Sequence, residues 1–530
     1  MYVAAMASHP SLRIVMLATA IALSSHQRAS AGESAGAAAL ERSVASIERS
    51  GCSLAGGRPV QSSRILSEFY RRRGFEPAWS DSSSVDELVD AVGEAEQQGL
   101  DPADYHLDAI LRLRREGGDD PRAVADRDLV LTDALLRLAS DVRFGRTRAR
   151  ALHTDAYGNR SLLSADPAAD LQKAIDDGQI RAFIESLEPA TAFYDRLQEG
   201  LASYRRIAAA GGWPTVGAGP SLKPGAKDRR VAMLRERLAV TGDIGEDVAT
   251  GAGDLYDASL VEGVRAFQAR HGLAADGVLG PGTLAALNVP VDQRIDQIRA
   301  TLERCRWFLR NLPDRFVMVN VAGYRVLFIE DGQVRWRSRV IVGKPYTKTP
   351  MFRANMESVI LNPTWTVPAS IVRNEMLPAI RRDPNYLAKK RISRVGGNFV
   401  QAAGPGNALG RIKLNLPNPH SVYLHDTPGK SLFESTTRTF SHGCVRVERP
   451  VELAALALDD PAWSVEALED AIATGVTRRI PLRTPIPVLV LYWSVTVNRE
   501  GTIEFLPDVY RRDAPIVRDL AAGATSGTCR

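Results

Sequence analysis

The spacing of apolar residues changes near residue 315, and this change constrains the fold more than any other feature of the sequence. Residues 62–208 and 228–290 carry apolar side chains at every third or fourth position, as amphipathic helices do. From Arg315 onward the apolar residues alternate or form short runs, which is typical of β-strands. Two pairs of turn residues, Ala322-Gly323 and Asp331-Gly332, separate the first three runs and indicate β-hairpins. We therefore predict a multi-domain α+β protein.

Individual elements follow from the same spacing. The predicted helices include Arg64–Arg72, Val85–Gln98, Asp128–Ser140 and Val451–Leu458. The predicted strands include Phe316–Val321, Tyr324–Glu330, Val334–Val342, Glu357–Leu361, Lys413–Asn415, Val422–His425 and Val445–Val447.

Length and composition exclude several classes of protein. The chain has 530 residues, which at about 150 residues per domain indicates three or four domains. Its 45% hydrophobic and 24% charged residues are ordinary for globular proteins. With 67 basic and 62 acidic residues the surface is mixed in charge, so we expect no nucleic acid partner. Four cysteines are too few for a disulfide framework in a chain of this length.

The N-terminal 31 residues have the pattern of a secretory signal peptide. Arg13 precedes the apolar run Ile14–Leu23, and the segment ends in the small residues Ala29-Ser30-Ala31. The alternative is a buried N-terminal helix. No other stretch reaches 18 apolar residues, so we expect an exported, periplasmic protein with no integral membrane span after cleavage.

Composition and pattern together divide the chain into segments. We predict a signal peptide at 1–31, a flexible lead-in at 32–60, a helical scaffold domain at 61–209, a Gly/Pro-rich linker at 210–227, a three-helix domain at 228–290, a connecting helix at 291–313, a mostly-β domain at 314–505 and a C-terminal tail at 506–530.

Within the mostly-β domain the strand pattern lapses at about 362–410. This stretch includes Trp365 and a predicted helix at Ser370–Arg382, kinked near Pro378. Insertions of this length in a compact domain are usually functional or disordered. The amphipathic helix favours an ordered lid.

The three-helix segment 228–290 resembles the peptidoglycan-binding domain of bacterial cell-wall enzymes. The resemblance rests on the run Ala266–Leu273, on Asp276-Gly277 and on Gly280–Leu284. Such a module binds wall glycan or peptide, or it only spaces its neighbours, and the sequence leaves both open.

Histidine and cysteine concentrate between residues 420 and 446. His420, His425, His442 and Cys444 fall within 25 residues of a chain with eight histidines and four cysteines. An imidazole near a thiol can accept its proton and hold a thiolate–imidazolium pair, which is the arrangement of cysteine nucleophiles. Gly443 allows a tight turn and leaves amide groups free to bind a developing oxyanion.

The spacing His425-x15-Ser441-His442-Gly443-Cys444 resembles the signature of the YkuD-type L,D-transpeptidases. The flanking residues 424–428 and 445–447 resemble the large, multi-domain proteobacterial branch, whereas many smaller members have Asn in place of Arg446. The resemblance extends over most of the chain after residue 31: a helical scaffold, an inserted binding domain and a catalytic domain with a long lid.

The resemblance implies a role for each matching residue. Cys444 is the expected nucleophile and His425 its general base. The Asp426 backbone carbonyl is expected to orient His425, and the Gly443 and Cys444 amides to form the oxyanion hole. His442 is expected to support that hole. The candidate substrate-binding residues are Arg446, Tyr423, Trp365 and Ser441. Arg446 could instead have a structural role, and Tyr423 and Trp365 could instead pack in the core.

The resemblance also implies the reaction. The thiolate attacks the bond between meso-diaminopimelate and the terminal D-Ala of a peptidoglycan tetrapeptide stem, D-Ala leaves, and the thioester passes to an amine of a second stem as a 3→3 cross-link. No cofactor or metal is required, and carbapenem-type β-lactams are expected to acylate the thiol.

Three alternatives remain. The three histidines and Cys444 could bind zinc, although the spacing lacks CxxC or HExxH. The chain could instead hydrolyse wall peptides as a carboxypeptidase or endopeptidase, or bind the wall without catalysis. The acceptor (stem peptide, lipoprotein or water), the protein partners and the pairing of Cys52, Cys305 and Cys529 also stay open.

Overall fold

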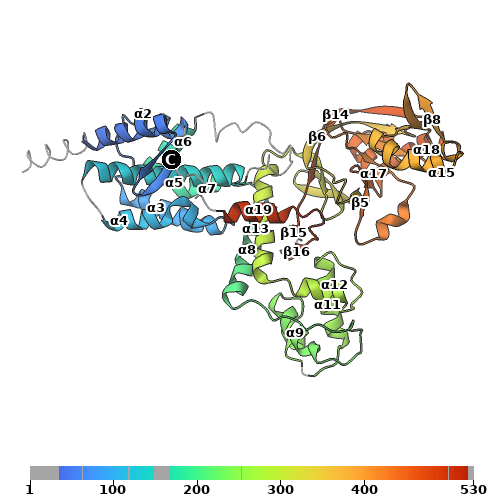
Figure 1. Cartoon of the computed structure of the whole chain (residues 1–530), viewed down its shortest axis with the longest axis horizontal. Coiled ribbons are helices and arrows are strands. Elements are labelled where there is room, and N and C mark those ends of the chain that lie inside the picture. The colour runs from blue at the N-terminus through green and yellow to red at the C-terminus, as the bar shows by residue number, and fades with distance from the viewer. Residues whose placement is uncertain are drawn as a thin grey trace, which may run out of the picture. The chain divides into compact units, whose positions relative to one another are not determined.

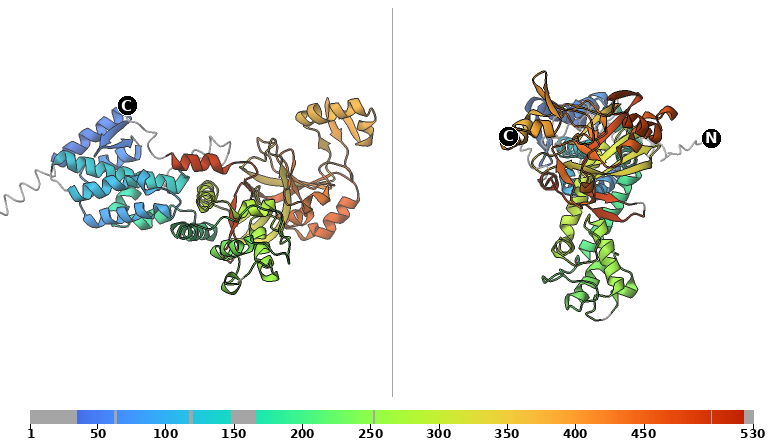
Figure 2. Two further views of the ribbon diagram at one scale, coloured as in Figure 1. Left: turned by 60° about the horizontal axis from the view of Figure 1, so that its bottom comes forward. Right: turned by 90° about the vertical axis from the view of Figure 1, so that its right-hand side faces the viewer.

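The computed structural model describes residues 35–61, 64–116, 120–147, 166–251, 253–498 and 500–522. The chain forms two compact units, and Figures 1 and 2 show its helices and strands. The predicted signal peptide at 1–31 lies outside the described residues. No helix among the described residues is both long and apolar enough to cross a membrane.

The first unit is a bundle of helices with one β-hairpin. Its helices are α2 (Arg64–Arg72), α3 (Ser82–Gly93), η1 (Glu94–Glu96), η2 (Pro102–Tyr105), α4 (Leu107–Glu116), α5 (Pro121–Phe144), α6 (Pro167–Asp176) and α7 (Ile180–Ser186). The buried carboxylate of Asp128 anchors the bundle, because it accepts hydrogen bonds from Tyr70 Oη (2.8 Å) and from the Trp79 amide (3.0 Å). The helical prediction is confirmed, with Arg64–Arg72 matching α2.

The predicted flexible lead-in at 32–60 is wrong over the residues that the structure describes. Residues 35–50 are helical, and β1 (Cys52–Ala55) pairs antiparallel with β2 (Arg58–Gln61). Leu40, Val44 and Ile47 recur on one helical face and are buried. Alanine-rich composition therefore reflected helix propensity and not flexibility.

The second unit includes α8 (Ala192–Ala209) and the predicted three-helix domain. Its helices are α9 (Arg230–Val240), α10 (Glu246–Ala249), α11 (Ala258–Arg270) and α12 (Pro281–Leu287). The predicted apolar faces, including Val231, Leu238 and Phe267, form one buried core. The Gly/Pro-rich linker is packed against this domain, where Leu222 pairs with Leu279.

The connecting helix α13 (Val291–Phe308) packs against α8. Its Arg306 Nη1 donates to Glu303 Oε2 at 2.8 Å, and both side chains are buried. Cys305 on the same helix is a buried free thiol. A pairing of Cys52 with Cys529 involves a residue outside the described part of the chain.

The remainder of the second unit is built on a nine-stranded sheet in the order β12-β5-β13-β11-β10-β6-β14-β3-β4, with β4 also paired to β5. Its strands are β3 (Arg315–Asn320), β4 (Arg325–Glu330), β5 (Gln333–Gly343), β6 (Phe352–Leu361), β10 (Ile412–Asn415), β11 (Leu424–His425), β12 (Thr439–Ser441), β13 (Val445–Val447) and β14 (Arg478–Leu491). The period-two segments are therefore strands, as predicted.

The two faces of this sheet differ around β10, β11 and β13. The residues facing one side, such as Leu414, Leu424 and Val445, are buried, and α17 (Pro450–Leu458) packs there against β10 and β14. The alternate residues face the other side, where Lys413 and Arg446 are only half-buried. One face is thus core, and the other is less completely buried. Beyond α17 follow η6 (Pro461–Trp463) and α18 (Val465–Ala473).

The insertion at 362–410 is ordered, as predicted. It contains β7 (Trp365–Thr366), α14 (Ala369–Ile371), the π-helical turn η4 (Val372–Met376), α15 (Leu377–Arg382), α16 (Tyr386–Lys389), β8 (Ile392–Val395) and β9 (Asn398–Gln401). The predicted kink is the π-helical turn just before Pro378. The three-stranded sheet β7-β9-β8 was not predicted.

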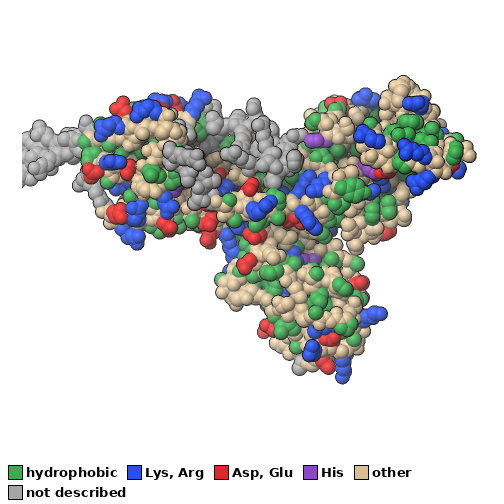
Figure 3. Space-filling view, viewed as in Figure 1, with side chains coloured by type: hydrophobic (Ala, Val, Ile, Leu, Met, Phe, Trp, Pro, Cys, Tyr) green, Lys and Arg blue, Asp and Glu red, His purple; other side chains and the backbone are tan. Residues whose placement is uncertain are grey.

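This insertion forms a small subdomain that projects from the large sheet (Figure 2, left). It carries seven Lys or Arg residues against two acidic ones. Figure 3 shows basic side chains gathered over α15 and β8. The lid is therefore a basic surface.

The predicted C-terminal tail is wrong in its described part. A hairpin of β15 (Val495–Val497) and β16 (Ile503–Phe505) leads to α19 (Asp513–Ala521). Tyr510 is buried, and Asp513 accepts a hydrogen bond from Arg304 Nη1 of α13 at 2.6 Å. Because these polar partners are far apart in sequence, the pattern alone gave no signal for them.

Candidate active site

Two parallel strands place the predicted nucleophile and base on one face. In the register of β11 and β13, Leu424 lies opposite Val445 and His425 opposite Arg446. The Val445 amide also donates to the Tyr423 carbonyl at 3.0 Å. Since side chains alternate along a strand, Tyr423, His425, Cys444 and Arg446 all project from the open face. The structure therefore brings together four of the predicted site residues.

The Cys444 thiol is partly enclosed and neutral in its resting state. Burial raises its pKa, while interactions with the Tyr423 amide and hydroxyl and the charges of Lys413 and Arg446 oppose the shift. Its Sγ lies 3.8 Å from the Ser421 carbonyl oxygen.

His425 is buried, and its pKa is lowered to about 3 by burial and then by the charge of Arg446. Interactions with the backbone of Asp426 and Leu409 act in the opposite direction. Its Nδ1 makes no hydrogen bond of standard geometry, and within the described chain none joins His425 to Cys444. Burial thus favours a neutral thiol and a neutral imidazole in the empty site, and the thiolate–imidazolium pair stays a prediction.

The Asp426 carboxylate is occupied by structural contacts. It accepts from the Arg411 amide at 2.9 Å and from Lys430 Nζ at 2.6 Å. Gly410 has a φ of +64°, and a Cβ there would lie 2.5 Å from the Asp426 side chain. The carboxylate thus fixes the backbone beside His425, and both the backbone and the charge of Asp426 act to raise the pKa of the imidazole.

The turn before Cys444 is held from within. Ser441 Oγ donates to the Cys444 carbonyl at 2.6 Å and accepts from the Gly443 amide at 3.1 Å. Ser441 is buried, so its predicted contact with substrate is wrong. The Gly443 amide is likewise engaged and is not free for an oxyanion, contrary to prediction. Among the described residues the Cys444 amide donates no hydrogen bond, which leaves it available.

Two residues that the sequence did not suggest support this turn. Thr349 Oγ1 donates to the Gly443 carbonyl at 2.9 Å and accepts from the Gly343 amide at 2.9 Å. Tyr510 Oη donates to the Gly343 carbonyl at 2.5 Å and accepts from the Thr349 amide at 3.2 Å. A chain of hydrogen bonds therefore joins the C-terminal segment to the turn that presents the thiol.

The aromatic residues Tyr423 and Trp365 lie at the thiol. The Tyr423 hydroxyl interacts with Cys444 and with the Trp365 side chain. Burial raises the pKa of Tyr423, so it stays protonated and can donate. Trp365, at the start of the insertion, is half-buried and thus reaches the site from the lid.

His442 connects the catalytic turn to the lid. Its Nε2 hydrogen-bonds to the Glu375 carboxylate on the π-helical turn η4. His420 lies apart, with its ring centroid 5.3 Å from that of Phe352. No cluster of three or more potential metal ligands occurs among the described residues.

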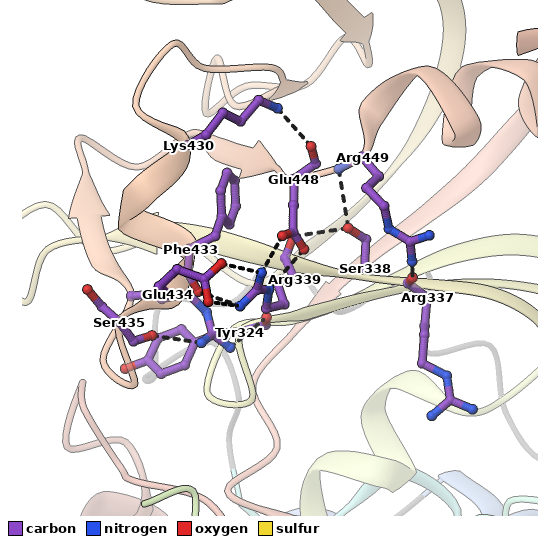
Figure 4. Close-up of polar contacts among 11 residues, drawn as sticks. Tyr324, Arg337, Ser338, Arg339, Lys430, Phe433, Glu434, Ser435, Glu448 and Arg449 are labelled. Atoms are coloured by element: carbon purple, nitrogen blue, oxygen red, sulfur yellow. Dashed lines mark hydrogen bonds and ion pairs between the residues drawn. The ribbon is translucent and has the colours of Figure 1, made fainter. Parts of the chain in front are cut away.

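An ion network between β5 and the end of β13 fixes the strands that carry the site (Figure 4). Arg339 on β5 pairs with Glu434 and with Glu448, which directly follows β13. Lys430 Nζ donates to the Glu448 carbonyl at 2.7 Å as well as to Asp426. The network thus ties the loop between the two catalytic strands, including η5 (Lys430–Glu434), to the sheet.

Comparison with known protein families assigns three regions. Residues 64–201 match a family described as "Scaffold domain", residues 228–287 match "Putative peptidoglycan binding domain", and residues 314–487 match "L,D-transpeptidase catalytic domain" (YkuD). The last of these regions contains all the predicted site residues, whereas the supporting residue Tyr510 lies beyond it.

Individual relatives agree with this assignment. A Haemophilus influenzae protein named "Putative L,D-transpeptidase" is 33% identical over 231 residues, which are 39% of this chain and 47% of that protein. The chain thus spans about half the length of this curated relative.

Two solved structures are also similar. An L,D-transpeptidase from Mycobacterium smegmatis has 13% identity over 34% of this chain and 58% of the other, with a TM-score of 0.20. An L,D-transpeptidase from Xylanimonas cellulosilytica has 18% identity over 52% of this chain and 99% of the other, with a TM-score of 0.19. On the family matches, the chain carries an L,D-transpeptidase catalytic domain of the YkuD family, joined to a scaffold domain and a peptidoglycan-binding domain.

Proposed function

We propose that this protein is an exported, periplasmic L,D-transpeptidase that forms 3→3 cross-links between peptidoglycan stems through a Cys444 thioester. The observation that carries the proposal is the shared face of β11 and β13, from which a half-enclosed thiol and a buried imidazole of lowered pKa both project. A neutral imidazole can act as a general base, which a permanently protonated one cannot.

The first half of the reaction forms the thioester. Cys444 Sγ attacks the carbonyl carbon between the L-centre of meso-diaminopimelate and D-Ala, and its proton passes to His425. The oxyanion accepts from the Cys444 amide. The C–N bond then breaks, D-Ala takes the proton from His425 and leaves, and the stem remains bound to sulfur.

The second half transfers the stem. An amine of a second stem attacks the thioester and gives a proton to His425, and the C–S bond breaks. The proton then returns to sulfur, which regenerates the thiol. Trp365 and the basic insertion suit a lid over an anionic peptide, and exclusion of water would favour transfer over hydrolysis.

The test is product analysis by mass spectrometry after incubation with a disaccharide-tetrapeptide. The wild type is expected to release D-Ala and to form a dimer of twice the substrate mass less D-Ala. Cys444→Ala should do neither, whereas Cys305→Ala, which removes the buried free thiol of α13, should retain both. D-Ala release with tripeptide monomer alone would identify a carboxypeptidase, and no reaction would refute an autonomous enzyme.

A further inference from the structure

Three neighbouring strands place two cations on either side of the catalytic imidazole. Lys413 on β10 lies opposite His425 on β11, and His425 lies opposite Arg446 on β13. Residues opposite each other project from the same face, so the three side chains form a row across the open side of the sheet. The buried, neutral imidazole thus lies between an ammonium and a guanidinium.

Both cations extend toward the thiol. Lys413 Nζ lies 4.2 Å from the centroid of the Tyr423 ring, whose hydroxyl interacts with Cys444. Lys413 and Arg446 each act electrostatically on the Cys444 sulfur. The reacting carbon of a substrate would therefore lie within the field of both charges.

Neither cation has an acidic partner within the described chain. Burial lowers the pKa of Lys413 and of Arg446, and Arg446 Nε is buried without a hydrogen bond. Elsewhere in this domain, Arg339 and Lys430 each bind a carboxylate. Half-buried cations that lack a counter-ion are unfavourable unless a ligand supplies the negative charge.

We propose that Lys413 and Arg446 together bind the C-terminal carboxylate of the donor stem, so that the enzyme requires a donor whose departing residue ends in a free carboxylate. This inference rests on the proposed function. In such a donor the carboxylate is three bonds from the carbonyl carbon that sulfur attacks, which places it beside the two cations. An extended peptide with an amidated end, or an internal peptide bond, would leave both charges unpaired.

Binding of the carboxylate would also affect the base. The charge of Arg446 lowers the pKa of His425 in the empty site. A bound carboxylate neutralises part of this charge, so the proton affinity of the imidazole rises when the correct donor is in place. Donor recognition and activation of the base are therefore coupled.

The experiment compares two donors that differ only at their end, a tetrapeptide stem with a free D-Ala carboxylate and the same stem as the D-Ala amide. For the wild type, we expect kcat/KM for the acid to exceed that for the amide by about 100-fold or more, as for loss of one partner of a buried charge pair. In Lys413→Met the ratio should fall below about tenfold, through loss of activity on the acid. Lys413→Arg should restore part of the ratio, and the exposed Lys223→Met of the linker should not change it.

A second readout does not depend on turnover. Cys444→Ala should bind the acid more tightly than the amide by calorimetry, and this preference should disappear in Cys444→Ala/Lys413→Met. The proposed carboxylate binding would be overturned if the wild type used both donors equally well, or if Cys444→Ala bound both equally tightly. It would also be overturned if Lys413→Met lost the same factor of activity on both donors, because the lysine would then only stabilise the thiolate. If the wild type turned over neither donor, the proposed function would fail. The binding comparison would still test whether Lys413 and Arg446 bind the donor carboxylate.

Discussion

At the scale of single residues, burial disfavours the charged form of both reacting groups. Burial raises the pKa of Cys444, and burial with Arg446 lowers the pKa of His425 to about 3. Free thiolate is the reactive species toward electrophiles. The empty enzyme should therefore be protected from adventitious oxidation and alkylation until a substrate is bound.

This state predicts a pH profile for alkylation of Cys444. The rate with iodoacetamide should rise about tenfold per pH unit between pH 6 and 8, because only the deprotonated fraction reacts. His425→Gln should leave this slope unchanged, since the imidazole stays neutral throughout that range. Peptide mass spectrometry separates label on Cys444 from label on the buried Cys305. A rate independent of pH would show a thiolate formed in advance and contradict the neutral pair.

The sequence predicted the central residues of the site and missed those that hold them. Cys444 and His425 could be placed because their spacing resembles the YkuD signature, and Tyr423 because it lies two residues from His425 on a predicted strand. Lys413 and Thr349 come to the site only through pairing of strands and turns distant in sequence. Ser441 was misassigned because a small polar residue next to a nucleophile suggests substrate contact, whereas its hydroxyl holds the turn.

At the scale of elements, the turn that presents Cys444 depends on a hydroxyl from the segment after β5. Thr349 is fully buried and bonds to Gly343 and Gly443 at once. Its removal would leave a buried amide and a buried carbonyl unpaired, which costs about 1–3 kcal/mol for each.

Thr349→Val keeps the shape of the side chain and removes the hydroxyl. We expect a lower melting temperature and a fall in kcat of roughly tenfold or more, because a small displacement of the thiol disrupts attack geometry. Thr349→Ser, which keeps the hydroxyl, should recover most of kcat, and the exposed Thr250→Val should have no effect. Steady-state kinetics and thermal unfolding measure both effects. Unchanged kcat in Thr349→Val would show that the turn holds without this bond.

At the scale of the whole molecule, the chain combines a catalytic domain with two domains that carry none of the site residues. The helical character of the first unit and the three-helix domain were predicted, because each element has a continuous apolar face. Residues 32–60 were predicted as flexible because they are rich in small residues, although their described part has a helical apolar face. Residues 506–530 were predicted as a tail, and their described part is held by tertiary contacts such as Arg304 with Asp513, which no local pattern records.

The most direct test of the central claim is the intact mass of the protein itself during reaction with a disaccharide-tetrapeptide. We predict a transient adduct equal to the donor less D-Ala, located on Cys444 by peptide mapping, released by hydroxylamine and absent from Cys444→Ala. Formation of the dimer by Cys444→Ala would contradict a Cys444 thioester. So would a wild-type reaction that releases D-Ala while the trapped adduct maps to a residue other than Cys444.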